Sequence, residues 1–84
     1  KYPAALSNMG YLTLIHDKNP EKAMEYYNRA LALDPDYDQA ILNKAGLLLY
    51  TGKNSEAKMI LQKFVKKYPE NMQAREILNQ MHPN

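Results

Sequence analysis

Residues 23–35 read AMEYYNRALALDP, and residues 57–69 read AKMILQKFVKKYP. The second stretch repeats the apolar and small positions of the first at a distance of 34 residues. The matching pairs are Ala23 and Ala57, Tyr27 and Leu61, Ala30 and Phe64, Leu31 and Val65, and Pro35 and Pro69. A fixed period of this size is typical of stacked supersecondary units, each of which needs a neighbour to cover its apolar face.

The segments before these stretches also repeat, but at a distance of 35 residues. Asn8, Gly10, Lys18 and Asn19 recur as Asn43, Ala45, Lys53 and Asn54. The first copy therefore holds one inserted residue. We place it near residues 20–22, because a first helical turn absorbs an extra residue more easily than a packed interior does. The same alignment sets Asp17 against Gly52, and both residue types tolerate a left-handed backbone at a helix end.

Apolar residues recur at steps of three and four, which predicts helices. We expect them at about residues 4–16, 19–33, 37–50, 54–68 and 70–81. Asn19 followed by Pro20 is a strong signal for a helix start, and Asn54 or Ser55 is the expected cap of the fourth helix. Alternation typical of strands is absent from the sequence.

Composition bounds the fold and its chemistry. At 84 residues the chain forms at most one small domain. It has no cysteine, which excludes disulfides and thiolate metal sites but does not fix the compartment. Eleven basic and nine acidic residues give a net charge of +2, too close to balance to favour nucleic acid or a membrane surface. No apolar run approaches the roughly 20 residues of a membrane span, and no motif implies a cofactor.

The first three residues, Lys1-Tyr2-Pro3, echo Lys67-Tyr68-Pro69 at the end of the second copy. No signal peptide is visible. We expect the chain to be a piece of a longer repeat protein.

Paired helices, a period of 34, small residues in the first helix and Pro at each junction resemble the tetratricopeptide repeat. The positions that carry the resemblance are Leu6, Met9, Gly10, Ala23, Tyr27, Ala30 and Pro35 in the first copy, and Ile41, Ala45, Ala57, Leu61 and Pro69 in the second. The resemblance implies an all-α, right-handed helix-pair solenoid. Residues 1–84 would form one domain, with repeats at 4–35 and 36–69 and a terminal solvating helix at 70–82.

Small residues at the helix contacts agree with this expectation. Gly10 and Ala23, like Ala45 and Ala57, would let the two helices of a repeat approach closely. Phe64 departs from the family pattern, which usually has Ala there. We expect its ring to fill a gap against the fifth helix.

In this family the first helix of each repeat lines a concave groove. The resemblance therefore implies a peptide-binding surface whose residues come from three helices. We expect Asn8, Tyr11 and Ile15 from the first, Gln39, Leu42, Asn43, Gly46 and Tyr50 from the third, and Gln73 from the fifth; Ser7 and Leu14 fall on the same stripe. Asn8 and Asn43 share one repeat position and could pair with a ligand's backbone amides. Alternatively, both cap, solvate or hold the contact between repeats.

Members of the family that bind chaperone tails use Lys and Arg on this face to clamp a carboxylate. Those positions here read Ser7, Tyr11, Gln39, Leu42, Gln73 and Ile77, so the clamp is missing. The groove is uncharged and carries Leu and Tyr, which suits a peptide with apolar anchors.

Other chemistry finds little support. His16 and Asp17 are neighbours that do not face each other on a helix, so they form no catalytic pair with Ser7, and neither histidine has a second metal ligand at helical spacing. Lys63, Lys66 and Lys67 form the densest basic cluster, which we interpret as a solvated helix end.

The sequence thus predicts a non-catalytic module that binds a protein or peptide, with no cofactor and no metal. The alternative is a structural role, as a segment of a longer array or as a self-associating domain. Two repeats expose apolar end faces that either an array or a second copy could cover.

Overall fold

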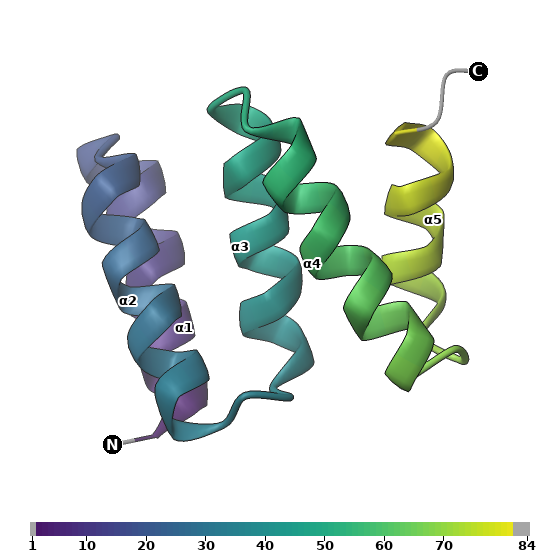
Figure 1. Cartoon of the computed structure of the whole chain (residues 1–84). Helices are drawn as coiled ribbons and strands as arrows, with labels where there is room; N and C mark the ends of the chain where they lie inside the picture. Colours follow the sequence, from purple (N-terminus) through teal and green to yellow (C-terminus); the bar gives the residue numbers. More distant parts are fainter. Residues whose placement is uncertain (1, 82–84) are drawn as a thin grey trace.

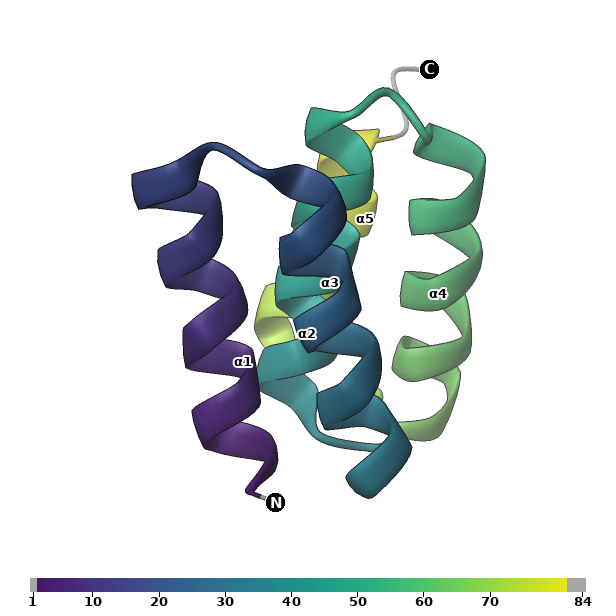
Figure 2. The same cartoon turned by 90° about the vertical axis from the view of Figure 1, so that its left-hand side faces the viewer.

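The computed structural model describes residues 2–81. This part of the chain contains five α-helices, one π-helical turn and no strand. The elements are α1 (Pro3–Leu12), η1 (Thr13–Asp17), α2 (Pro20–Leu33), α3 (Asp38–Tyr50), α4 (Asn54–Lys67) and α5 (Met72–Met81). Figure 1 shows α1 and α2 as one antiparallel pair, α3 and α4 as the next, and α5 beyond them. Seen from the α1 side, the first pair lies in front of α3 (Figure 2). The predicted all-α helix-pair solenoid is confirmed.

The start of α2 follows from its sequence. The Asn19 carboxamide oxygen accepts a hydrogen bond from the Lys22 backbone N–H at 3.1 Å, and Pro20 occupies the first helical position. An Asn cap satisfies a donor that the helix itself leaves free, and Pro has no N–H to satisfy there. The helix ends at Leu33, because Asp34 precedes Pro35 and its backbone is extended.

One predicted cap and one predicted helix start were wrong. The N-cap of α4 is Lys53, whose side chain makes no capping bond, so neither Asn54 nor Ser55 caps it. The fifth helix begins at Met72 rather than at residue 70, because Pro69 and Glu70 form a turn. Asn71 then caps α5 by accepting a hydrogen bond from the Ala74 N–H at 3.0 Å. The helix ends at Met81, as expected, and residue 82, the last residue of the expected terminal segment, lies outside the described residues.

The inserted residue of the first copy lies in the π turn. Lys18 has φ 52° and Gly52 has φ 84°, so these two left-handed residues, 34 apart, occupy the same place in the two repeats. Equivalence at 34 residues is thus already restored at Lys18. A π turn closes i→i+5 hydrogen bonds and absorbs one extra residue without ending the helix. The predicted insertion at 20–22 and the left-handed Asp17 were therefore wrong.

Two buried clusters join the helix pairs into one stack. Ala23 and Tyr27 of α2 pack with Leu47 of α3. The second cluster spans α3, α4 and α5 and consists of Ile41, Ala45, Leu61, Phe64 and Ala74. Each cluster crosses from one pair to the next element, so the core runs along the whole stack.

The closest approach of two helices lies at Gly10. A Cβ atom built on Gly10 would lie 2.6 Å from Cε1 of Tyr27 and 3.0 Å from the backbone oxygen of Ala23. No side chain fits that space, which confirms the expected role of Gly10.

Burial, and secondarily the nearby Tyr11, raises the pKa of Tyr27 above its ordinary value of 10.0.

Phe64 fills the space that we expected it to fill. Its ring belongs to the buried cluster that contains Ala74 of α5. The Tyr68 ring covers it with a centroid separation of 5.1 Å. The larger side chain thus joins α4 to α5.

A polar contact ties the loop after α2 to the end of α4. The Lys67 ammonium lies 2.9 Å from Oδ2 of Asp36, and the Tyr68 hydroxyl donates to the same oxygen at 3.0 Å. We call these three residues the junction clasp. The hydrogen bond from Lys67, followed by that from Tyr68, lowers the pKa of the Asp36 carboxyl. The bond to Asp36 raises the pKa of both Lys67 and Tyr68.

Candidate partner-binding surface

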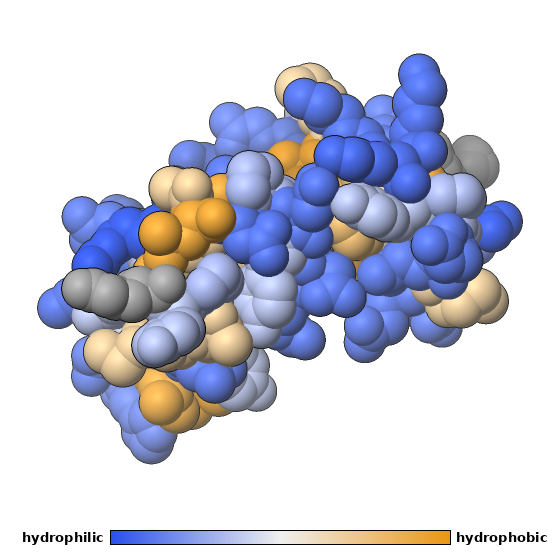
Figure 3. Space-filling model, turned by 90° about the horizontal axis from the view of Figure 1, so that it is seen from below, coloured by the Kyte–Doolittle hydropathy of each residue, from blue (hydrophilic) through white to orange (hydrophobic). Residues whose placement is uncertain are grey.

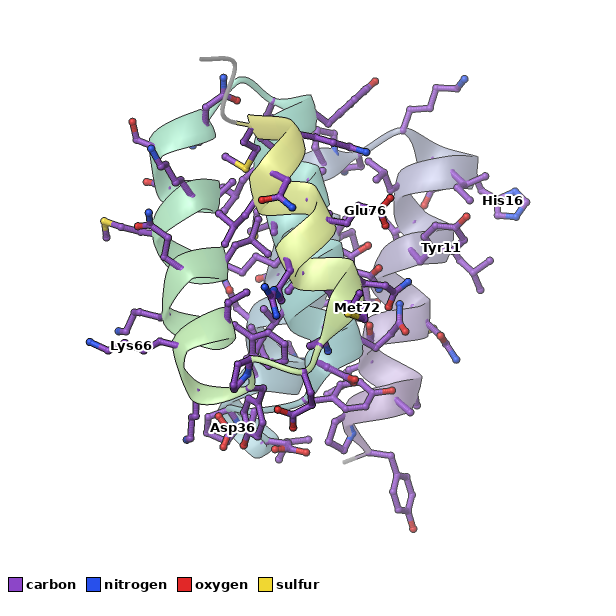
Figure 4. The ribbon with its side chains drawn as sticks, turned by 90° about the vertical axis from the view of Figure 1, so that its right-hand side faces the viewer. Tyr11, His16, Asp36, Lys66, Met72 and Glu76 are labelled. Atoms are coloured by element: carbon purple, nitrogen blue, oxygen red, sulfur yellow. The ribbon has the colours of Figure 1, made fainter. Side chains whose placement is uncertain are left out.

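The first helices of the two pairs and α5 lie on one side of the molecule. Figure 4 shows Tyr11 and His16 projecting toward the same side as Met72 and Glu76 of α5, while Lys66 projects from the opposite side. Helices α1 and α3 are in contact. We call the surface formed by α1, η1, α3 and α5 on this side the inner face.

Most of the predicted site residues are accessible. Leu42 and Asn43 are half-buried, and the others are exposed, namely Asn8, Tyr11, Ile15, Gln39, Gly46, Tyr50 and Gln73. The two tyrosines stand out, because Tyr11 is 52% exposed and Tyr50 is 77% exposed. Exposed rings bring large contact area at low entropic cost, so they are efficient anchors for a partner.

The two asparagines have different surroundings. The Asn43 amide donates to the Ser7 hydroxyl at 3.0 Å, which joins α3 to α1. Its carbonyl oxygen accepts from the Gln39 amide at 3.4 Å. Asn8 is exposed instead. An amide has two N–H donors, so Asn43 holds the contact between repeats and keeps one donor for a ligand.

Ser7 does not line the groove. It is completely buried, so its predicted place on the accessible stripe was wrong. Its hydroxyl is satisfied by Asn43 from the next repeat. The small side chain of Ser7 fits where α1 and α3 meet. Position in the repeat alone does not show whether a residue faces the groove or the neighbouring helix.

Gly46 opens a space in the middle of α3. A Cβ atom there would have nothing within 4 Å, so packing does not require the glycine. Glycine inside a helix weakens it by about 0.5–1 kcal/mol relative to alanine. The vacancy lets a ligand approach the α3 backbone closely.

The structure adds two residues to this surface that sequence reasoning missed. Met72, which is 73% exposed, and His16 project on the same side as Tyr11 (Figure 4). Counting back from the turn residues Lys18 and Gly52, His16 takes the place of Tyr50 in the first repeat. The sequence did hold a signal for His16. The distance between equivalent residues changes from 35 to 34 near the turn, and at a distance of 34 His16 corresponds to Tyr50.

The described residues contain no cluster of three or more side chains that could hold a metal ion. None of the helices between residues 2 and 81 has the length and apolar character needed to cross a membrane.

A family model of the tetratricopeptide repeat matches residues 14–81. This range holds most of η1 and all of α2, α3, α4 and α5. The chain belongs to the tetratricopeptide repeat family. In this family such repeats are generally non-catalytic modules for protein interaction, and the first helices of successive repeats, here α1 and α3, line the inner face.

Two curated proteins resemble the chain. Anaphase-promoting complex subunit 7 of Arabidopsis thaliana is 33% identical over 67 residues, which is 80% of this chain and 12% of that protein. Photosystem I assembly protein Ycf3 of Acaryochloris marina (strain MBIC 11017) is 39% identical over 51 residues, 61% of this chain and 30% of that protein. The chain thus spans less than a third of either relative. No solved structure matches the chain significantly.

Within the described residues, one face of α1 is not covered by another helix, although the equivalent face of α3 is. In α3, Ala40 is fully buried and Leu47 is only 3% exposed, and Leu47 packs against α2. Their equivalents in α1 are Ala5, which is exposed, and Leu12, which is 49% exposed. We call Ala5, Met9 and Leu12 the end face. Figure 3 shows hydrophobic residues gathered over the first helix pair at the left, while polar residues dominate the other half.

Proposed function

We propose that this repeat pair binds an extended or helical peptide segment of a protein partner on its inner face. The observations that carry the proposal are the exposure of Tyr11 and Tyr50 and the open space at Gly46. Neither ring belongs to the two buried clusters. Tyrosine is enriched at protein interfaces because its ring adds large contact area at low entropic cost.

The chemistry of the inner face indicates the kind of peptide. Asn8, Gln39 and Gln73 are uncharged and can both donate to and accept from a peptide backbone. Tyr11, Tyr50 and Met72 offer contacts for apolar anchors. Recognition would rest mainly on backbone hydrogen bonds and a few apolar side chains, with Glu76 of α5 as a charged group on the same side.

The proposal includes a non-catalytic role. The module would act by holding a partner close to the rest of a larger protein. Both relatives carry names that refer to multiprotein assemblies, one as a subunit of the anaphase-promoting complex and the other as an assembly protein for photosystem I. These names support a role in protein assembly and leave the partner of this chain to experiment.

The test begins with a display library of random peptides of about 12 residues, from which binders of the chain are selected. The affinity of an enriched peptide is then measured by calorimetry for three proteins: the unaltered chain, the double variant Tyr11→Ala/Tyr50→Ala, and Met59→Ala. Met59 is a matched control because it is also a large exposed side chain, but it lies on α4.

We expect the double variant to weaken binding about tenfold or more and the control to change it less than about twofold. Circular dichroism checks that all three proteins remain folded. Equal affinity of all three proteins, or equal losses in both variants, would contradict binding on the inner face.

The end face supports a second candidate function, which is docking of another helix. Ala40 and Ala74 are both completely buried at the equivalent positions of α3 and α5, because α2 and α4 precede those helices in the stack. A helix placed on α1 as α2 lies on α3 would bury Ala5, Met9 and Leu12. That helix would come from another repeat of a longer array or from a second copy of this chain.

Sedimentation measurements at protein concentrations between about 10 µM and 1 mM test whether a second copy binds the end face. Self-association through the end face predicts dimers that Leu12→Lys abolishes and Met59→Lys does not. A monomer over the whole range would contradict self-association and leave docking within an array as the structural candidate.

A further inference from the structure

A pocket on the other side of the molecule is not part of the inner face. It has a volume of about 320 Å³ and lies where the end of α2, the following loop, α3 and α4 meet. Its apolar wall comes from Leu31, Ile41, Ile60 and Phe64. The volume is at the lower end of the range for small-ligand pockets, about 300–1,000 Å³, and provides room for one or two large side chains.

Lysines surround this apolar wall. Lys44 of α3 and Lys63 and Lys67 of α4 all line the pocket. On α4 the spacing of Ile60, Lys63 and Lys67 follows i, i+3 and i+7, which places them on one face of the helix. Lys44 is half-buried, as expected when an alkyl stem lies along an apolar wall while the ammonium reaches water. We call this feature the lysine-rimmed pocket.

Only part of the positive charge at the rim is neutralised within the described residues. Asp36 also lines the pocket, and its ion pair with Lys67 is the one salt bridge found between residues 2 and 81. Lys44 and Lys63 therefore have no carboxylate within ion-pair distance in this part of the chain. Lys66 belongs to the same basic run in the sequence but does not line the pocket, and Figure 4 shows it projecting away from the body of the molecule.

We propose that the lysine-rimmed pocket binds an acidic peptide segment that inserts an apolar side chain between α3 and α4. The wall provides a site for a Leu or Phe anchor, and the free ammonium groups of Lys44 and Lys63 complement carboxylates on either side of it. A peptide can carry an apolar anchor and carboxylates on one short segment, which matches an apolar wall with lysines beside it. This binding mode is independent of the inner face and would let the module contact two segments at once.

The probe is a fluorescein-labelled peptide in which a Leu-Phe pair is flanked on both sides by glutamates, and binding is read by fluorescence anisotropy. A second peptide replaces Leu-Phe by Ser-Ser, and a third replaces the glutamates by lysines. The protein variants are Lys44→Gln/Lys63→Gln and the matched control Lys66→Gln. Lys63 and Lys66 are exposed and Lys44 is half-buried, so circular dichroism verifies that each variant remains folded.

We expect the acidic Leu-Phe peptide to bind the unaltered chain, with affinity that falls as NaCl rises from about 50 to about 500 mM. Lys44→Gln/Lys63→Gln should weaken binding about five- to tenfold, and Lys66→Gln less than about twofold. The Ser-Ser and lysine peptides should bind much more weakly. Binding should survive Tyr11→Ala/Tyr50→Ala, which separates this site from the inner face.

Four results would overturn the proposal. The first is no binding of the acidic Leu-Phe peptide by the unaltered chain. The second is equal binding of the Ser-Ser peptide, which would indicate charge attraction alone. The third is an equal loss in Lys66→Gln. The fourth is binding to phosphatidylglycerol vesicles with no binding to the peptide, which would assign the lysines to a lipid surface.

Discussion

In the first helix pair the missing side chain of Gly10 leaves room for the ring of Tyr27, whereas the second pair has Ala45 and Leu61 at the same positions. All of these residues are buried in both repeats. The first repeat thus combines glycine with the large ring of tyrosine. The second repeat combines alanine with the smaller side chain of leucine. In these two repeats the larger ring is matched by the smaller partner, as a close-packed interior requires when volume is added on one helix.

A second difference lies at the equivalent positions Ala30 and Phe64. Ala30 is fully buried in a pair that is followed by another complete pair. Phe64 lies in the pair that is followed by α5, and its ring shares a buried cluster with Ala74 of that helix. The larger ring supplies contact area between α4 and α5.

The largest expected effect comes from removing that ring. Phe64→Ala should destabilise the fold by about 3–5 kcal/mol, because it leaves a cavity between α4 and α5. Urea unfolding followed by circular dichroism measures the loss. The control Met59→Ala removes an exposed side chain of the same helix and should stay within about 0.5 kcal/mol. A loss from Phe64→Ala no greater than that of the control would show that the ring does not hold α5.

Gly10→Ala should give the next largest loss, about 1–3 kcal/mol, since its methyl group would overlap the ring of Tyr27. The double variant Gly10→Ala/Tyr27→Leu recreates the combination of the second repeat. A double-mutant cycle by urea unfolding should show that Tyr27→Leu is less harmful in the Gly10→Ala background than in the unaltered chain. Strict additivity of the two changes would refute the compensation between these positions.

A gain in stability, rather than a loss, is expected from the same substitution at Gly46. Gly46→Ala should stabilise the chain by about 0.5–1 kcal/mol, because a methyl group there meets only open space. Thermal unfolding measures the gain, with Gly10→Ala as the contrasting variant. If a ligand backbone occupies this space, the same substitution should weaken binding of a peptide selected for the inner face. A gain in stability with unchanged affinity would remove Gly46 from the site.

The smallest effect concerns the junction clasp. The pKa of Asp36 in the folded chain is below its ordinary value of 3.8, so the clasp favours folding above pH 3.8 and this contribution is lost as pH falls through the lowered pKa. The pKa of Tyr68 is raised above 10.0, so its contribution is complete below pH 10 and is lost as pH rises through the raised pKa. Asp36 and Lys67 are solvent-exposed and Tyr68 is only half-buried, so the contribution of the clasp to stability is small.

Thermal unfolding of the unaltered chain and Asp36→Asn across the pH range measures this effect. We expect a slightly lower stability of the variant near neutral pH and a difference that vanishes at low pH. A difference that grows as pH falls would assign another role to the carboxylate.

The sequence predicted the helices and their stacking because these depend on local patterns. Pro20 after Asn19, the Pro residues at the junctions and the spacing of Ala23 and Tyr27 each indicate structure within a few residues. The place of the insertion required the backbone angles of Lys18 and Gly52. Either side of the turn could have held the extra residue, and a π turn leaves no composition signal of its own.

The site was predictable in outline only. Repeat position alone placed Tyr11 and Tyr50 among the site residues, and both are exposed. It could not distinguish Asn8 from Asn43, because the bond from Asn43 to Ser7 joins residues 36 apart in the chain. The lysine-rimmed pocket was missed for the same reason: Lys44 and Lys63 come together only when α3 packs on α4.

The most direct test of the account is a titration of the selected peptide into the ¹⁵N-labelled chain, followed by amide chemical shifts. Binding on the inner face predicts the largest shifts at Asn8, Tyr11, Gly46 and Tyr50, and little change along the exposed side of α2 and α4. Shifts confined to α2 and α4, with α1 and α3 unchanged, would contradict the inner face as the partner-binding surface.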